Sequence, residues 1–87
     1  GFACKAALPH GAVSMTLGDH PPSGCGYPSV DDRRITCDLV FAASYMDINV
    51  LDHIVVGADA HFSFADHGLI REYRKRALDF HENRGAA

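Results

Sequence analysis

The sequence predicts a single α/β domain in which helices are layered on a sheet. Two segments, 30–46 and 69–80, carry apolar residues at the three-to-four spacing of amphipathic helices. Three shorter segments, 12–17, 50–57 and 61–64, show alternation or β-branched residues, as strands do. Because strands and helices follow one another along the chain, a helix-covered sheet is expected. The length of 87 residues suffices for one compact domain and is too short for two.

The first elements are expected to be the end of a helix, a strand and a loop. Residues 2–8 have the Ala and Lys content of a helix, which Pro9 and then Gly11 would end. In segment 12–17, apolar and polar residues alternate, which predicts a strand with one face in a core. Segment 18–28 is rich in Gly and Pro and is expected to form a structured loop.

The helix expected over 30–46 has the clearest start signal in the chain. Ser29 and Asp32 are spaced as in a capping box, in which each side chain bonds the other residue's backbone N–H. Apolar residues then recur at helical spacing. The residues expected to face the core are Ile35, Leu39, Ala42, Ala43 and Met46.

Two strands and a helix are expected to complete the domain. Segment 50–57 is rich in β-branched residues and ends at glycine, which predicts a central strand buried on both faces over most of its length. A short strand around 61–64 follows a turn. One face of the last helix is expected to pack on the core through Leu69, Tyr73, Ala77 and Phe80.

Composition argues against several functional classes. The formal net charge is −3, so the electrostatic attraction that drives non-specific binding to DNA is missing, and direct DNA binding is disfavoured. The longest apolar stretches fall far short of the ~20 residues that a membrane span requires. The three cysteines are an odd number without Cys-x-x-Cys spacing, which argues against a disulfide framework or zinc ribbon and favours the cytoplasm.

Candidate chemistry is concentrated in segment 18–28 and the first turn of the following helix. Nitrogen and oxygen donors at a strand end and a helix start are typical of metal and anion sites. An alternative is that Ser29 and Asp32 only cap the helix and that His20 is a solvated loop residue. The candidate donors are Asp19, His20, Ser29, Asp31 and Asp32.

Several runs of residues carry a resemblance to a known family. The runs are Pro22-Ser23-Gly24, Pro28-Ser29 with Asp32, Leu51-Asp52-His53-Ile54-Val55-Val56-Gly57, Ser63-Phe64 and Gly68-Leu69-Ile70. Together with Lys5-Ala6-Ala7-Leu8 and His10, they resemble the C-terminal domain of the RadC family over about residues 5–70. The resemblance implies a cytidine-deaminase-like JAMM/MPN sandwich, a central mixed sheet flanked by helices, with residues 1–87 forming part of such a domain.

The resemblance also implies a zinc-dependent metallopeptidase site. In such a site a His-x-His pair and the Asp of Ser-x-x-Asp hold zinc, whose water attacks an amide of a peptide or protein substrate while an upstream Glu takes the proton. Ser29 would then be a catalytic residue that stabilises the oxyanion, and Asp32 would be a metal ligand. When this sequence is placed against the family's His-x-His pattern, however, Asp19 and Pro21 occupy the two histidine positions, and His20 lies between them.

These replacements are expected to impair the site. Alternate residues of an extended segment point in opposite directions, so His20 faces away from the metal position unless the two prolines bend the segment or its register slips. Pro21 offers no side-chain donor, which leaves Asp19 and Asp32 where zinc needs three protein ligands. Two carboxylates suit a weakly held hard cation better than zinc. Asp19, His20 and Asp32 therefore remain the candidate metal residues.

Two functional interpretations remain open at this point. The first is a RadC-like domain whose family activity, amide or isopeptide hydrolysis, is impaired. The second is a non-catalytic interaction domain that binds a protein or is associated with DNA repair. The general base is expected upstream of Gly1, so the chain would be a partial domain. A sheet edge left open in this way would favour a homo-oligomer.

Overall fold

The computed structural model of the chain describes residues 2–7, 13–21 and 24–86. The elements in chain order are β1 (Phe2–Ala7), β2 (Val13–Asp19), α1 (Val30–Tyr45), β3 (Ile48–Val56), β4 (His61–Ser63) and α2 (Leu69–Ala86). The strands form one four-stranded sheet in the order β1-β2-β3-β4. The predicted α/β class is confirmed.

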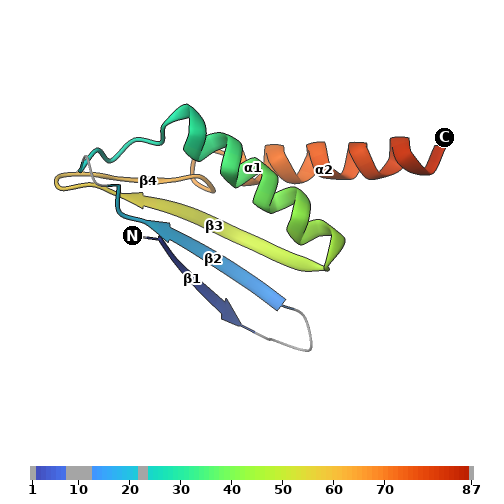
Figure 1. Ribbon diagram of the computed structural model, residues 1–87, viewed down its shortest axis with the longest axis horizontal. Helices are drawn as coiled ribbons and strands as arrows, with labels where there is room; N and C mark the ends of the chain where they lie inside the picture. Colours follow the sequence, from blue (N-terminus) through green and yellow to red (C-terminus); the bar gives the residue numbers. More distant parts are fainter. Residues whose placement is uncertain (1, 8–12, 22–23, 87) are drawn as a thin grey trace.

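The sheet is mixed, and its helices form a second layer. β1 and β4 run antiparallel to their neighbours, whereas β2 and β3 are parallel and are joined by α1 as a crossover. In Figure 1 both α1 and α2 lie on the same side of the sheet. No helix in the described part of the chain is long and apolar enough to cross a bilayer.

A β-bulge in β3 decides which of its residues face the core. The register with β2 shifts between Met15 and Thr16, so that Leu51 is an extra residue in β3. Val50 before the bulge and His53 after it are both buried, although they are three positions apart and an odd spacing would place them on opposite faces of a regular strand. β3 is central, as expected, but Leu51 is 49% exposed, so the expectation of burial on both faces is wrong at this position.

The first element is a strand, so the expected helix over 2–8 is wrong. β1 pairs with β2 from Phe2 opposite Asp19 to Ala7 opposite Ser14. This pairing satisfies the inner backbone groups of β1, whereas an isolated helical piece of this length is not stable in water. The helix propensity of alanine is a weak preference that sheet pairing overrides. Leu8, Pro9 and Gly11, where the helix was expected to end, lie outside the described residues.

α1 spans nearly the predicted residues but turns a different face to the core. The buried face runs through Thr36, Val40 and Ala43, with Leu39 packed beside it. Thr36 can be buried because its hydroxyl is hydrogen-bonded, a possibility that the apolar spacing does not reveal. The expected core positions that are exposed instead are Ile35, Ala42 and Met46.

The core lies between the helices and the sheet. In α2, Tyr73 and Ala77 are buried as expected, whereas Phe80 is 45% exposed and packs against Phe41 of α1 with ring centroids 5.8 Å apart. The exposure of Phe80 corrects its assignment to the core. The buried apolar cluster comprises Leu17, Val40, Ala43, Val50, Val55, Phe62, Phe64, Ile70 and Tyr73.

Candidate functional site

The candidate site lies where two loops meet at one edge of the sheet. Because β2 and β3 are parallel, their carboxyl ends share this edge, and the Ala58 N–H donates to the Gly24 carbonyl across the two loops at 3.1 Å. A Cβ added to Gly57 would lie 2.5 Å from the Gly26 nitrogen. Gly57 is therefore required by this close approach, which holds the loop after β2 against the turn after β3.

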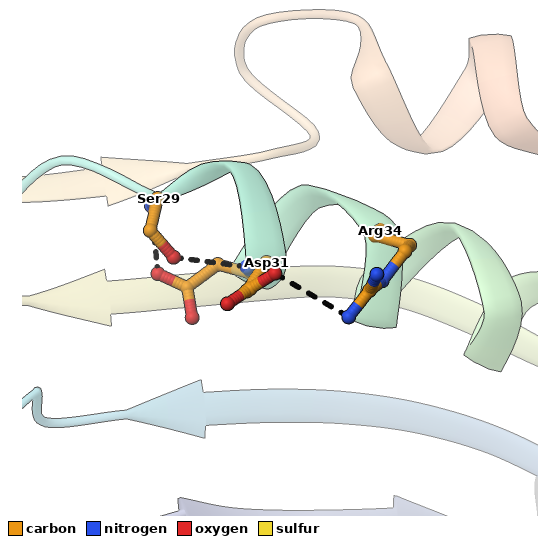
Figure 2. A network of polar contacts seen from close by, with 4 residues as sticks. Ser29, Asp31 and Arg34 are labelled. Atoms are coloured by element: carbon orange, nitrogen blue, oxygen red, sulfur yellow. Dashed lines mark hydrogen bonds and ion pairs between the residues drawn. The ribbon is translucent and has the colours of Figure 1, made fainter.

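The N-terminus of α1 forms another side of the site, beside the two loops. The Ser29 N–H donates to Asp32 Oδ2 at 2.8 Å, and the Asp32 N–H donates to Ser29 Oγ at 3.0 Å (Figure 2). This is the capping box that the sequence predicts. Asp31 forms an exposed ion pair with Arg34 at 3.3 Å, a contact of little energetic weight. The helix start is thus fixed by Ser29 and Asp32.

A pocket of about 580 Å³ opens between the end of β2 and the start of α1. It brings together four of the five candidate donors, because Asp19, Ser29, Asp31 and Asp32 all line it. His20, the fifth, is exposed and lies outside this lining. Among the described residues, the lining comprises Asp19, Pro21, Cys25, Tyr27, Pro28, Ser29, Asp31 and Asp32.

Tyr27 is a pocket residue that sequence reasoning missed. Its side chain is 72% exposed, and its ring centroid lies 6.4 Å from that of the buried Phe62 of β4. The only signal in the sequence is an aromatic residue within a Gly- and Pro-rich loop. The tyrosine gives the pocket an aromatic wall beside its carboxylates.

The donors at this pocket do not fit a zinc ion. Within residues 2–7, 13–21 and 24–86, no group of three or more His, Cys, Asp or Glu side chains is placed to hold a metal ion. Pro21 has no side-chain donor, and one carboxylate oxygen of Asp32 already accepts the Ser29 N–H. Catalytic zinc requires three protein ligands and an open position.

A buried histidine connects β3 to the second turn of α1. His53 is 1% exposed, and its Nδ1 lies 2.6 Å from Thr36 Oγ1. The Thr36 hydroxyl donates its single proton to the Asp32 carbonyl at 2.6 Å, so Nδ1 must carry the proton that binds Oγ1. His53 is thus a core histidine whose Nδ1 is hydrogen-bonded. Through Thr36, this histidine supports the backbone that carries Asp32.

Acid is expected to destabilise the fold through His53. Burial lowers the pKa of His53 from its ordinary value of 6.5, while the negative charges of Asp19, Asp32 and Asp52 partly oppose this lowering. Because the folded protein binds a proton at His53 less readily than the unfolded chain does, the neutral imidazole stabilises the fold. This stabilisation is fully present above pH 6.5, the unfolded pKa, and is lost as the pH falls through the lower pKa of the folded state.

Urea unfolding followed by circular dichroism from about pH 7.5 to about pH 5.5 measures this loss, since the interval begins above the unfolded pKa of histidine. The control is His53→Gln, in which the contribution of this imidazole is absent and the decline over the interval should be smaller. An equal decline in both proteins would contradict the assignment.

The aspartate beside His53 fastens β3 to the turn that precedes α2. Asp52 Oδ1 accepts the N–H groups of His53 at 2.7 Å and Ala65 at 2.9 Å, and Oδ2 accepts the Ser63 hydroxyl at 2.6 Å. The ring of His53 also stacks on Phe64 at 4.8 Å between centroids. The Asp-His and Ser-Phe runs therefore make direct contacts that build the fold.

Comparison with known proteins identifies the family of this chain. Residues 3–69 match the family described as RadC-like JAB domain. UPF0758 protein YeeS of Escherichia coli K12 is 48% identical over 66 residues, which cover 76% of this chain and 45% of YeeS. UPF0758 protein PSHAa2643 of Pseudoalteromonas translucida is 47% identical over 66 residues, or 76% of this chain and 30% of that protein. The chain thus spans less than half the length of these relatives. It belongs to the RadC family and carries a RadC-like JAB domain.

Proposed function

We propose that this RadC-like JAB domain binds a segment of a protein partner in the pocket between β2 and α1 and does not perform zinc-dependent hydrolysis. The observation that carries the proposal is Pro21, which occupies a position where the family resemblance expects a zinc ligand and has no donor to offer. The pocket nevertheless keeps Asp19, Ser29 and Asp32 on its walls. A cleft with this lining can bind a ligand without a metal.

The chemistry of the pocket favours a segment that carries a basic side chain. Asp19 and the second oxygen of Asp32 are acceptors for an ammonium or guanidinium group. The exposed Tyr27 ring adds an aromatic face, on which a cation is attracted electrostatically. Pro21 and Pro28 supply apolar surface for the stem of such a side chain. A lysine- or arginine-containing peptide fits these features.

Selection of a random peptide library on the purified chain, followed by calorimetric titration of the winning peptides, tests this function. We expect peptides with Lys or Arg, bound equally well with EDTA or with added zinc. Asp19→Ala should weaken binding about tenfold, the effect of losing one charged contact. The matched control is Asp38→Ala, an exposed α1 residue outside the pocket lining. Binding that requires zinc, or that Asp19→Ala leaves unchanged, would contradict the proposal.

Amide or isopeptide hydrolysis is the second candidate function. It is favoured by the meeting of Asp19, Ser29 and Asp32 in one pocket, since Ser29 and Asp32 stand at the positions that the family resemblance gives to a catalytic serine and a ligand. Cleavage of a lysine isopeptide by the zinc-supplemented wild type, abolished in Asp32→Asn, would establish this candidate in place of the first. No cleavage would leave the binding function.

A role in DNA repair would act through a protein partner under this proposal. The net charge of −3 opposes direct contact with DNA phosphates, because such contact depends on neutralising basic groups. Cys4, Cys25 and Cys37 are held as thiols, which suits the reducing cytoplasm as the place of action.

A further inference from the structure

A second cleft, lined by arginines, lies between α1 and α2. The two helices cover the same face of the sheet (Figure 1) and pack against each other, with Ser44 Oγ of α1 2.7 Å from His81 Nε2 of α2. Nearer the start of both helices, a cleft of about 340 Å³ opens between them. We call it the arginine cleft. The lining residues that matter for its chemistry are Arg33, Arg34 and Asp38 of α1 and Tyr73 and Arg76 of α2.

Helical spacing places these side chains on the facing sides of the two helices. Residues three or four positions apart share one face of a helix. Arg34 and Asp38 have this spacing in α1, and Tyr73 and Arg76 have it in α2. The Arg76 guanidinium lies over the Tyr73 ring, 5.6 Å from its centroid. Because α2 begins at Leu69, where the family match ends, this wall of the cleft is not part of the site that the family resemblance implies.

Tyr73 shows that guanidinium groups from both helices converge in the cleft. Its side chain is only 5% exposed. Burial and the neighbouring Cys37 raise the pKa of its phenol above the ordinary 10.0, whereas the positive charges of Arg33 and Arg76 oppose this rise. Arg33 of α1 and Arg76 of α2 therefore lie close to the same hydroxyl. This hydroxyl has no hydrogen-bond partner among the described residues, so it is available to a ligand.

The arginines of the cleft are held only by weak ion pairs. Arg34 lies 3.3 Å from Asp31 and Arg76 lies 3.5 Å from Glu72, and all four side chains are more than half exposed. Exposed pairs of this kind contribute little to stability. Within the described part of the chain, Arg33 forms no ion pair. An incoming anion can therefore replace Asp31 and Glu72 at little cost and bind Arg33 directly.

The charge of the lining fits a dianion. Three arginines and one aspartate give it a formal charge of +2 at neutral pH. A phosphate monoester carries a charge of about −1.5 to −2 at this pH and has three strong acceptor oxygens. Guanidinium groups bind such oxygens through two parallel N–H donors. A carboxylate or a phosphodiester carries a single negative charge and would neutralise only half of the lining.

We propose that the arginine cleft binds a phosphate monoester, whose oxygens accept hydrogen bonds from Arg33, Arg34 and Arg76 and from the Tyr73 hydroxyl. A phosphorylated side chain of a protein and a small phosphate compound both offer this group. Duplex DNA is a poor ligand, since its phosphates are diesters and the chain has a net charge of −3. The cleft shares no lining residue with the pocket between β2 and α1, so the proposal stands independently of peptide binding there.

Calorimetric titration of the full chain with N-acetyl-O-phosphoserine amide, in a phosphate-free buffer, tests the cleft. We expect a dissociation constant below about 1 mM that rises about tenfold in Arg33→Ala, the effect of losing one charge-assisted contact. Arg33→Lys keeps the charge but not the planar fork, so its affinity should lie between the two. The matched control is Arg71→Ala, which removes the same charge from an exposed α2 position outside the cleft and should bind as the wild type does. No binding by the wild type, or equal losses in Arg33→Ala and Arg71→Ala, would overturn the proposal.

Further titrations separate the sources of the phosphate. A capped peptide with phosphoserine between alanines should bind at least about tenfold more tightly than the capped amino acid if the source is a phosphorylated protein, and equally well if it is a small phosphate compound. The same peptide with glutamate should bind at least about tenfold more weakly than the phosphopeptide. Duplex DNA that competes equally at the same phosphate concentration would overturn the choice of a monoester. Asp19→Ala should leave phosphate binding unchanged, so a failure at either site is recognised separately.

Discussion

Replacing Phe64 with alanine is expected to lower the free energy of unfolding by about 3–5 kcal/mol, the cost of removing a large aromatic residue from a core. Phe64 is fully buried, at 0% exposure. Its ring stacks on His53 at 4.8 Å, meets Phe62 edge-on at 5.4 Å and lies 6.4 Å from Tyr73. The cavity would therefore open between β3, β4 and α2 at once.

Urea unfolding followed by circular dichroism measures the effect of Phe64→Ala. Folded domains have only about 5–15 kcal/mol of stability, so the variant should be close to unfolding at room temperature. The matched control is Phe80→Ala. Phe80 is 45% exposed and buries less apolar area than Phe64, so its replacement should lower the free energy of unfolding by only about 1 kcal/mol. Equal losses for the two variants would contradict the placement of Phe64 at the centre of the core.

Replacing Asp52 with alanine is expected to cost about 3 kcal/mol, because hydrogen bonds to a charged acceptor contribute about 1.5–3 kcal/mol each and water recovers part of the loss. The carboxylate accepts from the N–H groups of His53 and Ala65 and from the Ser63 hydroxyl. Without it, the link between β3 and the turn before α2 is lost, and the Ser63 hydroxyl keeps only its bond from the Asp66 N–H.

The same unfolding measurement applies to Asp52→Ala, with Asp59→Ala as control. Asp59 is exposed in the turn between β3 and β4 and should change stability by less than about 0.5 kcal/mol, as surface residues do. Ser63→Ala should cost less than Asp52→Ala, because it removes only one of the three bonds to the carboxylate. A loss for Asp52→Ala no larger than that for Asp59→Ala would contradict the role of this carboxylate in the fold.

Local signals were sufficient for the parts of the fold that depend on neighbouring residues. The capping box of Ser29 and Asp32 set the start of α1, and β-branched residues followed by glycine marked β3. Both depend on contacts within a few residues. The meeting of Asp19 with the start of α1 was also expected, because the family resemblance assigns Asp19, Ser29 and Asp32 to one site.

Features that depend on distant partners could not be predicted. β1 has the composition of a helix and becomes a strand because β2 lies beside it. The bulge at Leu51 reverses the facing pattern of β3 through pairing with β2. Thr36, a polar residue, enters the core because His53 meets its hydroxyl from another element. Likewise, Tyr27 lines the pocket because the close approach of Gly57 and Gly26 positions its loop.

The residues that carry the family resemblance divide into two groups in this chain. Asp52, His53, Ser63 and Phe64 contact one another and hold the sheet to α2. At the two positions that the family resemblance gives to metal-binding histidines, this chain carries Asp19 and Pro21, and Pro21 has no side-chain donor. Such a difference leaves the fold intact, because function depends on a site that the fold carries.

The zinc content of the reconstituted protein tests the central claim most directly. Metal-free wild type and Asp19→His/Pro21→His would be incubated with excess zinc, desalted and measured by mass spectrometry of the metal. We predict substoichiometric zinc in the wild type and stoichiometric zinc in the double variant, which Asp32→Ala then removes. Stoichiometric zinc in the wild type, abolished by Asp32→Ala, would contradict the account.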